Sequence, residues 1–582
     1  MKKLLPYGGA LLALAATAGL SGFTPALFHI FEKNSEHELL SIFFQIGLLF
    51  VLSFIVFYIS HITALPSFVI AIFFGIAAQK ALLPIVTRHE LLGAIVGLSA
   101  TLILFSGGLE TPFANFKKLL GRIISLSFIG LFITAATFSL AVLSIGRFLG
   151  AEVPLVIAVL LGAVLSSTDP AAIIPILKRL RFFNRSTKDL IISESAVTDV
   201  TGTLLTIAFL ALIAAGTALP SVGAWYASIF SAHSGVIVLR QIVFGIAFGV
   251  VGYGFLELLQ RLKRRHEREF EADSAFFLFV PVIIFAIAVS FGGSGYLAAF
   301  IAGLIFNLTE HLYQTERFFN HVIDGFLKPM IFILLGALVN VNELVNYAAV
   351  GIVSALVFMV IIRPLAVFIS LGPSCWLGRE RLSIRDLLFI ACVRETGAIP
   401  AVLLITIASL GLPYTQALVA IGMWVILLTL IIEPIMTPAV ARLLKVAELI
   451  EDEHKAEVGP SPVALLGTRG RSFINRLPRV AEWANKHSIK RVIVLLCLEN
   501  KFTAKLEQEI IAEAEQEFAR LNTTLPHKLE FSVLSRRGFL QTNIKTLAEK
   551  DTSVTAIFVG HKMLDFRLKE IKKLHAPLYF ME

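Results

Sequence analysis

Long apolar segments alternate with short polar ones over residues 38–443 of this chain. A helix needs about 20 mainly apolar residues to cross the hydrocarbon core of a bilayer, and on that criterion the pattern predicts about thirteen spans. These lie at 38–60, 63–84, 91–110, 120–148, 153–177, 189–215, 234–258, 274–291, 295–310, 325–342, 346–371, 386–409 and 415–443. The pattern therefore predicts an all-α polytopic membrane domain.

A further apolar run occupies residues 1–30. Two lysines before it and small residues towards its end are typical of a signal peptide. The run is also long enough for one more transmembrane helix, starting in the cytoplasm. We expect a retained helix and keep a cleaved signal peptide as the alternative. Both place residues 32–38 on the outer side of the membrane.

The pattern changes after about residue 445. Short buried-type runs alternate there with amphipathic stretches, which is typical of a small α/β domain with a mostly parallel sheet. The expected strands are 463–466, 491–498, 529–534 and 554–559. The expected helices are 472–485, 504–521, 541–549 and 565–574. Residues 444–460 are predicted to be a polar linker to this domain, which occupies 461–582.

Composition and charge agree with membrane insertion. The 582 residues are 57% hydrophobic and 16% charged, whereas soluble proteins have about 25% charged residues. Dense basic clusters occupy three loops, at 178–188, 261–268 and 379–385, which alternation of the spans places on one side. Because Lys and Arg collect in cytoplasmic loops, we expect a multi-pass protein of the cell membrane, of bacterial inner-membrane type, with a cytoplasmic C-terminal domain. Clusters between spans are topology signals, so no nucleic-acid partner is expected.

Two predicted spans are interrupted by polar residues and proline. The first contains Ser166-Ser-Thr-Asp-Pro170 and the second contains Arg394-Glu-Thr-Gly-Ala-Ile-Pro400. Proline removes a backbone donor and frees a carbonyl one turn earlier, and lipid offers no partner for such groups. Broken helices at matching places in two halves of a chain indicate an inverted-repeat secondary transporter with its site at the breaks.

Carboxylates within the spans form the candidate site. Asp169 precedes Pro170, and Asp199 lies in the middle of the next span, where a charge costs about 2.5–3.5 kcal/mol. Ser195 lies one turn before Asp199 on the same helix face. Burial favours the protonated form of a carboxylate and a nearby cation favours the ionised form, so a proton and a cation can compete for Asp199. Asp169 and the Thr168 carbonyl add oxygen ligands suited to a transient monovalent cation.

Other charged residues lie in the spans as well. Glu194 needs a partner; Arg363 is the expected one and Arg394 the alternative, and such a buried pair would be structural. Arg394 and Glu395 lie in the second interruption. Arg394 would either lower the proton affinity of the aspartates or neutralise the half-helix dipoles. Helix capping is the alternative role of Asp169.

The order of these motifs resembles that of the monovalent cation:proton antiporters of the sodium/proton exchanger branch. Thr168-Asp-Pro170 is followed by Glu194-Ser-x-x-x-Asp199, and later by Gly295-Tyr-Leu-Ala-Ala-Phe-Ile-Ala-Gly303, Ile362-Arg-Pro364 and the Arg394 segment. The resemblance covers about residues 38–443. It implies a thirteen-helix fold of inverted repeats and a homodimer. It also implies a core domain that moves against a dimerisation domain.

The resemblance also implies roles for residues. Asp199 would be the carboxylate that binds the proton and the cation, helped by Asp169, Ser195 and the Thr168 carbonyl. Glu194 would belong to the structural ion pair of the family, with Arg363 as its mate.

The chain departs from the family pattern at two positions. Electroneutral members usually have Asn before the key aspartate and electrogenic members a second Asp, whereas this chain has Thr198. Because Thr adds no charge, a one-for-one electroneutral exchange fits better. Where the family often carries a Glu in the third core span, this chain has Ser106 in Phe105-Ser-Gly-Gly108. Ser106 is a weaker ligand, so the sequence leaves Na⁺, K⁺ and Li⁺ open.

We therefore predict a secondary antiporter for Na⁺ or K⁺ and H⁺ with a role in pH homeostasis, and not an enzyme. Its partners would be the ions, membrane lipid and a second copy of the chain, without a cofactor. The alternative is a K⁺ efflux system gated by an unknown ligand of the C-terminal domain, which lacks a Gly-x-Gly-x-x-Gly fingerprint. A distant alternative is an intramembrane aspartyl protease using Asp169 and Asp199, whose Gly-x-Gly-Asp and Tyr-Asp motifs do not surround these residues.

Overall fold

The computed structural model divides the chain into two compact units, Met1–Leu449 and Ile450–Glu582. The first is described over residues 5–31, 37–63, 65–111, 113–168, 176–177, 180–265, 273–306, 319–375, 382–393 and 396–449. The second is described over residues 463–468, 471–487, 489–498, 504–523, 525–526, 528–537, 540, 543–544, 547, 554–560 and 578–581.

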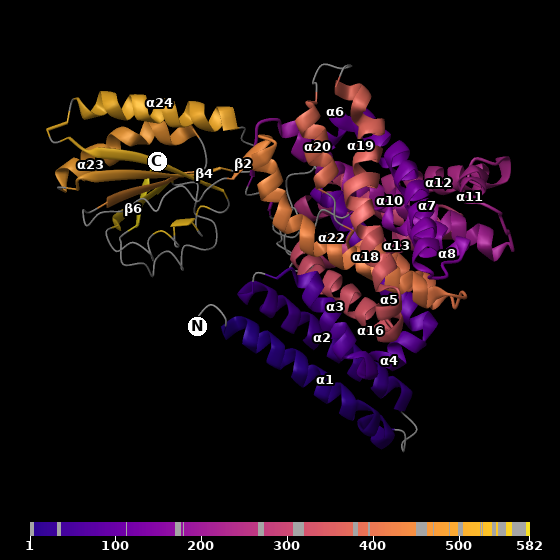
Figure 1. The fold of residues 1–582 in the computed structure, drawn as a ribbon. Coiled ribbons are helices and arrows are strands. Elements are labelled where there is room, and N and C mark those ends of the chain that lie inside the picture. The colour runs from indigo at the N-terminus through magenta and orange to yellow at the C-terminus, as the bar shows by residue number, and fades with distance from the viewer. Residues whose placement is uncertain are drawn as a thin grey trace. The chain divides into compact units, whose positions relative to one another are not determined.

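The first unit is built from helices (Figure 1). Its α-helices are α1 (Leu5–Phe31), α2 (His37–Ile62), α3 (Ser67–Ala77), α4 (Gln79–Thr87), α5 (His89–Glu110), α6 (Phe113–Ile124), α7 (Leu131–Leu149), α8 (Leu155–Leu165), α10 (Arg185–Ala214), α11 (Val222–Ser228), α12 (Ala232–Arg265), α13 (Asp273–Ser290), α14 (Gly295–Phe306), α16 (Lys328–Leu338), α17 (Val341–Asn346), α18 (Ala348–Val357), α19 (Arg363–Leu371), α20 (Ile384–Cys392), α21 (Ala398–Ser409) and α22 (Thr415–Leu443). Short π-helical segments η1 (Ser125–Gly130), η3 (Ile323–Leu327) and η4 (Phe358–Ile362) and the 3₁₀ turn η5 (Gly372–Cys375) continue some of them.

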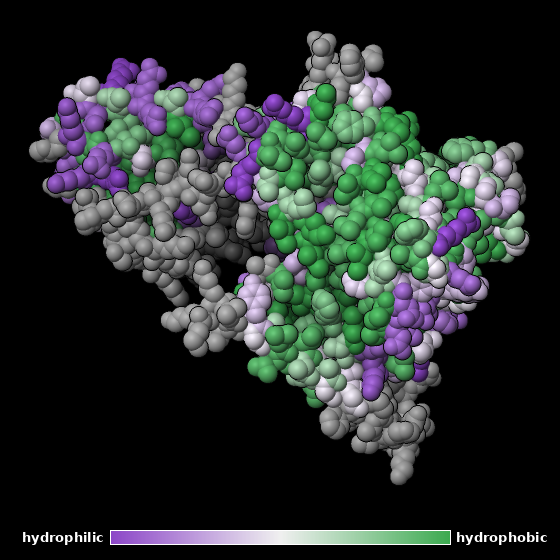
Figure 2. Space-filling view, in the orientation of Figure 1, coloured by the Kyte–Doolittle hydropathy of each residue, from purple (hydrophilic) through white to green (hydrophobic). Residues whose placement is uncertain are grey.

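The apolar helices of this unit are those of a multi-pass membrane protein. Within the described residues, 8 helices are long and apolar enough to cross a membrane, or 9 if the bent pair α3–α4 counts as one span. Shorter apolar helices lie at Tyr7–Gly22, Leu155–Leu165, Ala275–Ser290, Gly295–Phe306 and Ala398–Ser409. Apolar side chains cover much of the visible face of this unit (Figure 2). Leu356, Val360 and Leu365 are among its large apolar residues that are exposed. An apolar surface of this extent is expected where the neighbour is lipid.

The second predicted span is not continuous. α3 and α4 are bent by 88° on either side of Ala78. Distant parts of the unit hold the bend: Gln79 Nε2 donates to Val339 O at 2.8 Å, and Ala81 N donates to Ser21 Oγ at 3.1 Å. Because these partners lie far away in the sequence, the local hydropathy pattern contains no sign of the bend.

Two helix crossings depend on glycine. α5 crosses α14 at Gly108 and Gly303, where an added Cβ atom would lie 2.4 Å and 2.3 Å from a backbone oxygen of the other helix. α3 crosses α16 at Gly75 and Gly336, where the corresponding distances are 2.1 Å and 2.2 Å. Backbones in membranes approach this closely when small residues line the interface. The α5–α14 and α3–α16 crossings therefore have the same geometry, with a glycine of each helix against the backbone of the other.

The C-terminal unit contains a parallel five-stranded sheet with the strand order β5-β4-β3-β6-β7. Its elements are β3 (Val463–Thr468), η6 (Arg471–Arg476), α23 (Leu477–Lys486), β4 (Arg491–Leu498), α24 (Ala504–Asn522), β5 (Glu530–Arg537), β6 (Val554–Gly560) and β7 (Leu578–Met581). Alternate strand residues are buried on opposite faces, and α23 and α24 cover one of them. The sequence pattern did not predict β7, and the helix expected at 565–574 lies outside the described residues.

A short two-stranded sheet joins two segments of the first unit that are distant in the sequence. β1 (Leu180–Phe182) pairs antiparallel with β2 (Ala447–Leu449). β1 lies in the basic loop expected at 178–188, and β2 lies within the linker expected at 444–460. Residues 444–449 thus belong to the helical unit, because backbone hydrogen bonds to β1 order them.

The crossing of α5 and α14 predicts that alanine lowers stability at one of two adjacent glycines and not at the other. Gly108→Ala would push a Cβ atom into Phe300 O, and overpacking of this kind costs about 1–3 kcal/mol. Gly107→Ala meets nothing within 4 Å and is the matched control. We expect a lower apparent melting temperature of the detergent-solubilised chain for Gly108→Ala alone. Equal melting temperatures for the two variants would show that this crossing is not tightly packed.

Candidate ion-binding site

The first interruption begins where α8 ends. Ser166 is the C-cap of α8 and still has helical backbone angles, whereas Ser167 and Thr168 lie outside any helix. All three residues are buried. Ser166 Oγ donates to Ala163 O at 2.6 Å, which occupies one carbonyl at the helix end. The expected site residues Asp169 and Pro170, which come next, lie outside the described residues.

α10 packs closely against this non-helical stretch. Its first turn is capped by Asn184, whose side chain accepts from Ser186 N at 3.1 Å. A Cβ atom at Gly202 would lie 2.9 Å from Ser167 Cβ. Glycine at this position therefore lets the middle of α10 approach the end of α8.

Asp199 faces the interruption from α10. Ser167 Oγ donates to Asp199 Oδ1 at 2.5 Å, and Asp199 is 8% exposed. A hydrogen bond from a hydroxyl to a carboxylate is charge-assisted and is shorter than one between neutral groups. Ser167 was not among the predicted site residues, although it belongs to the same polar run as Thr168.

Threonine and serine hydroxyls join the interruption to α10. Ser195 Oγ donates to Thr168 O at 2.5 Å, so the carbonyl expected to be free for a cation accepts a hydrogen bond here. Thr198 Oγ1 donates to Ser195 O at 2.9 Å. It also lies 3.3 Å from Thr168 N and 2.6 Å from Thr168 Oγ1. Because a hydroxyl has one proton and two lone pairs, Thr198 accepts both of these bonds.

The second interruption repeats this arrangement. Thr396, between α20 and α21, donates its N–H to Thr429 Oγ1 of α22 at 3.4 Å, and the two hydroxyls are 2.5 Å apart. Thr429 Oγ1 in turn donates to Val425 O at 2.9 Å. The expected residues Arg394 and Glu395 lie outside the described residues. Pro400 is not in the break but in the first turn of α21, where a missing N–H leaves no intrahelical bond unmade.

A buried ion pair involves Glu194, five residues before Asp199 on α10. Arg363 Nη2 is 3.1 Å from Glu194 Oε2, and the two side chains are 2% and 3% exposed. Arg363 follows directly on the π-helical segment η4, and a second π-helical segment, η1, contacts α10 on the same side. Within η1, Ser127 Oγ donates to Glu194 O at 3.4 Å, and Ser127 O accepts from Thr201 Oγ1 at 3.1 Å. Such π-bulges inside helices often occur at functional sites.

The hydroxyl of Ser106 has a partner of its own. Ser106, at the position where the family often has Glu, donates to Asn320 Oδ1 at 2.8 Å. Among the described residues, no three His, Cys, Asp or Glu side chains lie close enough together to hold a metal ion. The hydroxyls and carbonyls named above offer oxygen atoms, which suit hard monovalent cations better than transition metals.

The first unit thus combines several helices that could cross a membrane with a buried carboxylate, Asp199, that accepts a hydrogen bond from a hydroxyl of the first interruption. The family model described as "Sodium/hydrogen exchanger, transmembrane" matches residues 48–443, so the chain belongs to the sodium/hydrogen exchanger family. This confirms the resemblance seen in the motifs, and as a member of that family the chain is a monovalent cation:proton antiporter and not an enzyme.

Individual relatives agree with this assignment. The K(+)/H(+) antiporter NhaP of Alkalimonas amylolytica is 28% identical over 506 residues, covering 85% of this chain and 76% of that protein. The K(+)/H(+) antiporter NhaP2 of Shewanella sp. (strain ANA-3) is 28% identical over 392 residues, covering 67% of this chain and 61% of that protein. The fold is similar to that of the sodium proton antiporter MjNhaP1 from Methanocaldococcus jannaschii, at a TM-score of 0.54 and 21% identity, over 68% of this chain and 99% of that one.

The ion pair generates a stability prediction. Glu194→Gln would leave the Arg363 cation buried without its counter-charge, and breaking a buried pair in this way costs about 3–5 kcal/mol. We expect a clear fall in the apparent melting temperature of the purified chain. Asp199→Asn is the matched control, because it neutralises a carboxylate of the same helix and still accepts the bond from Ser167. An equal fall for both variants would contradict a special structural role of the pair.

Proposed function

We propose that the exchange takes place at Asp199, which binds a proton and a monovalent cation in turn. The observation that carries this proposal is the position of Asp199: it is 8% exposed, inside α10, and within 2.5 Å of a hydroxyl of the interrupted segment. A cation there would replace the interaction that the bound proton makes with the carboxylate, so the two cannot bind together. Competition of this kind makes the exchange obligatory.

The cation would be held by oxygen atoms on both sides of the interruption. Asp199, Ser195 and the Thr168 carbonyl converge there, since Ser195 and Thr168 are already joined by a hydrogen bond. Rotation of the Ser195 hydroxyl would release a lone pair of each oxygen for the ion. We propose Asp169 as a further ligand, on the strength of its place directly after Thr168.

We propose Thr198 as an organiser of the break rather than an ion-binding charge. Its hydroxyl accepts from the Thr168 N–H, which the interrupted helix leaves without an intrahelical acceptor. Because Thr198 carries no charge, one carboxylate of α10 titrates at the break. This supports an electroneutral exchange of one cation for one proton.

The transported cation is proposed to be Na⁺ or K⁺. The relatives in Alkalimonas and Shewanella are named K(+)/H(+) antiporters, and the structural neighbour is a sodium proton antiporter. Hydroxyl, carbonyl and carboxylate oxygens suit either ion.

We further propose thirteen spans in inverted repeats with alternating access, in a homodimer. The shorter apolar helices would complete the spans beside the long ones. Matching hydroxyl pairs at the two interruptions, Thr168–Thr198 and Thr396–Thr429, support the internal repeat, as do the matching glycine crossings. The N-terminal helix α1 would be retained.

Residues 461–582 of the C-terminal unit are proposed to be a cytoplasmic regulatory domain. The basic loops on the same side of the membrane support that location. The chain reaches it through β2, which pairs with β1, and β1 ends shortly before α10. A ligand of the C-terminal unit that displaced β2 would therefore act on the start of the helix that carries Asp199, which keeps a gated K⁺:H⁺ antiporter as the second candidate.

Exchange in everted membrane vesicles tests the role of Asp199. We expect Na⁺ or K⁺ to dissipate a preset proton gradient with the wild-type chain and no exchange with Asp199→Asn, which cannot carry a proton at this position. Glu152→Gln is the control, because Glu152 is an exposed carboxylate distant from both interruptions in the sequence. Exchange by Asp199→Asn at the wild-type rate would place the site elsewhere.

Membrane potential tests the stoichiometry. Moving one net charge across 100 mV is worth about 2.3 kcal/mol, so an electrogenic cycle should change its rate severalfold when a potential is imposed on proteoliposomes. For the one-for-one exchange proposed here, we expect the same rate with and without the potential. A potential-dependent rate would require a second charge in the cycle.

A further inference from the structure

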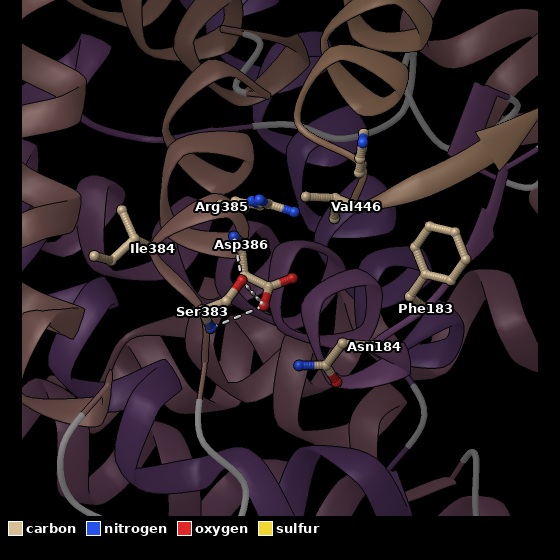
Figure 3. Close-up of a pocket in the computed structure, with 8 residues that line it drawn as sticks. Phe183, Asn184, Ser383, Ile384, Arg385, Asp386 and Val446 are labelled. Carbon is tan, nitrogen blue, oxygen red and sulfur yellow. Dashed lines mark hydrogen bonds between the residues drawn. The ribbon is translucent and has the colours of Figure 1, made fainter.

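An open cavity of about 470 Å³ lies in the helical unit, and none of its lining residues belongs to either interruption (Figure 3). Three segments meet around it: the turn between β1 and α10, the start of α20, and the turn between α22 and β2. Each of these segments adjoins a helix that flanks one of the two interruptions: α10 at the first, and α20 and α22 at the second. An occupant of this cavity would touch all three at once.

Two cationic side chains line the cavity. Arg385 comes from α20 and Lys445 from the turn after α22, and both are exposed. Figure 3 shows Arg385 extending toward Val446, the neighbour of Lys445. Over the described part of the chain, neither cation has a carboxylate within 4.0 Å. The cavity therefore presents concentrated positive charge.

The one carboxylate among the lining residues, Asp386, is hydrogen-bonded within the protein. Asp386 Oδ2 accepts from Ser383 N at 2.9 Å and from Ser383 Oγ at 2.7 Å. Its Oδ1 accepts from Thr187 Oγ1 at 2.7 Å. These bonds form the capping box of α20 and join it to α10. Asp386 is 6% exposed, so its oxygens are directed to these donors, and the lining has two cations against this one carboxylate.

The backbone of Lys445 is left-handed, with φ +52°. The residue follows the C-cap of α22, where Lys445 N donates to Arg442 O at 3.1 Å and Val446 N donates to Ala441 O at 3.1 Å. Glycine is the usual residue at this position of a helix end. Replacing Lys445 by glycine would therefore remove the cation and relieve the backbone at the same time.

Large apolar side chains flank the cations. Phe183 and Ile384 both line the cavity, and each is 65% exposed. Phe183 is fixed in place by a backbone hydrogen bond from its N–H to Val446 O at 3.1 Å. Cationic groups next to exposed apolar ones match a phosphate group that carries an apolar tail.

We propose that this cavity binds a phosphate-bearing anion, with Arg385 and Lys445 as the charge-assisted donors. The anion would be the headgroup of an acidic phospholipid or a free phosphate compound, which share this chemistry. Bound there, it links the start of α10, the start of α20 and the end of α22. The binding itself does not depend on the proposed exchange at Asp199.

The test is binding to the purified full chain in a neutral detergent, measured by native mass spectrometry and by thermal shift. The probes are phosphatidylglycerol, phosphatidylcholine and inorganic phosphate. We expect phosphatidylglycerol to bind more tightly than phosphatidylcholine, and the variant Arg385→Gln/Lys445→Gly to weaken this binding at least about tenfold, because a hydrogen bond to a charged group is worth about 1.5–3 kcal/mol. Binding of inorganic phosphate with the same dependence on the two cations would assign the site to a soluble ligand instead of a lipid.

Two comparisons keep the test decisive. Lys445→Gly alone relieves the left-handed backbone and so preserves the fold, and we expect it to lose several-fold in affinity without a fall in melting temperature. Arg147→Gln removes a cation of α7, outside the cavity, and should bind as the wild type does. Equal binding by the double variant and the wild type would overturn the proposal, as would a wild type that binds neither phosphatidylglycerol in preference to phosphatidylcholine nor phosphate.

Discussion

A break in a helix inside a membrane exposes backbone groups that lipid cannot satisfy, and the arrangement of this protein follows from that constraint. At both interruptions the solution is a threonine of the following helix. Thr198 and Thr429 each donate to a carbonyl of their own helix and accept from a threonine of the break. A hydroxyl suits this task because it both donates and accepts without adding charge.

Two buried carboxylates of α10, Glu194 and Asp199, have different partners. Glu194 and Arg363 neutralise each other in a buried contact, so that pair has no net charge to exchange. Asp199, five residues later, accepts a hydrogen bond from the neutral hydroxyl of Ser167. The close approach that brings Ser167 to Asp199 depends on Gly202, since a side chain there would meet Ser167.

The sequence predicts the features of this protein that depend on bulk hydrophobicity. Apolar length was sufficient for the multi-pass membrane domain, and the motifs around Asp199 were sufficient for the family. The bend at Ala78 was not predictable, because its stabilising partners Val339 and Ser21 are remote in sequence. The Thr396–Thr429 pair was missed for a similar reason: threonine costs little in a span, so its presence gives no local signal. The partner of Asp199 likewise depends on which serine faces α10 after α8 ends.

The central claim is that one carboxylate binds either a proton or a cation, and the pH dependence of cation affinity tests it most directly. The measurement is the half-saturating concentration of Na⁺ or K⁺ for exchange in proteoliposomes, taken at a series of pH values. Direct competition predicts that on the acidic side this concentration rises about tenfold for each unit of pH, with an unchanged maximal rate. A half-saturating concentration that stays constant while the maximal rate changes with pH would contradict binding of both ions at Asp199.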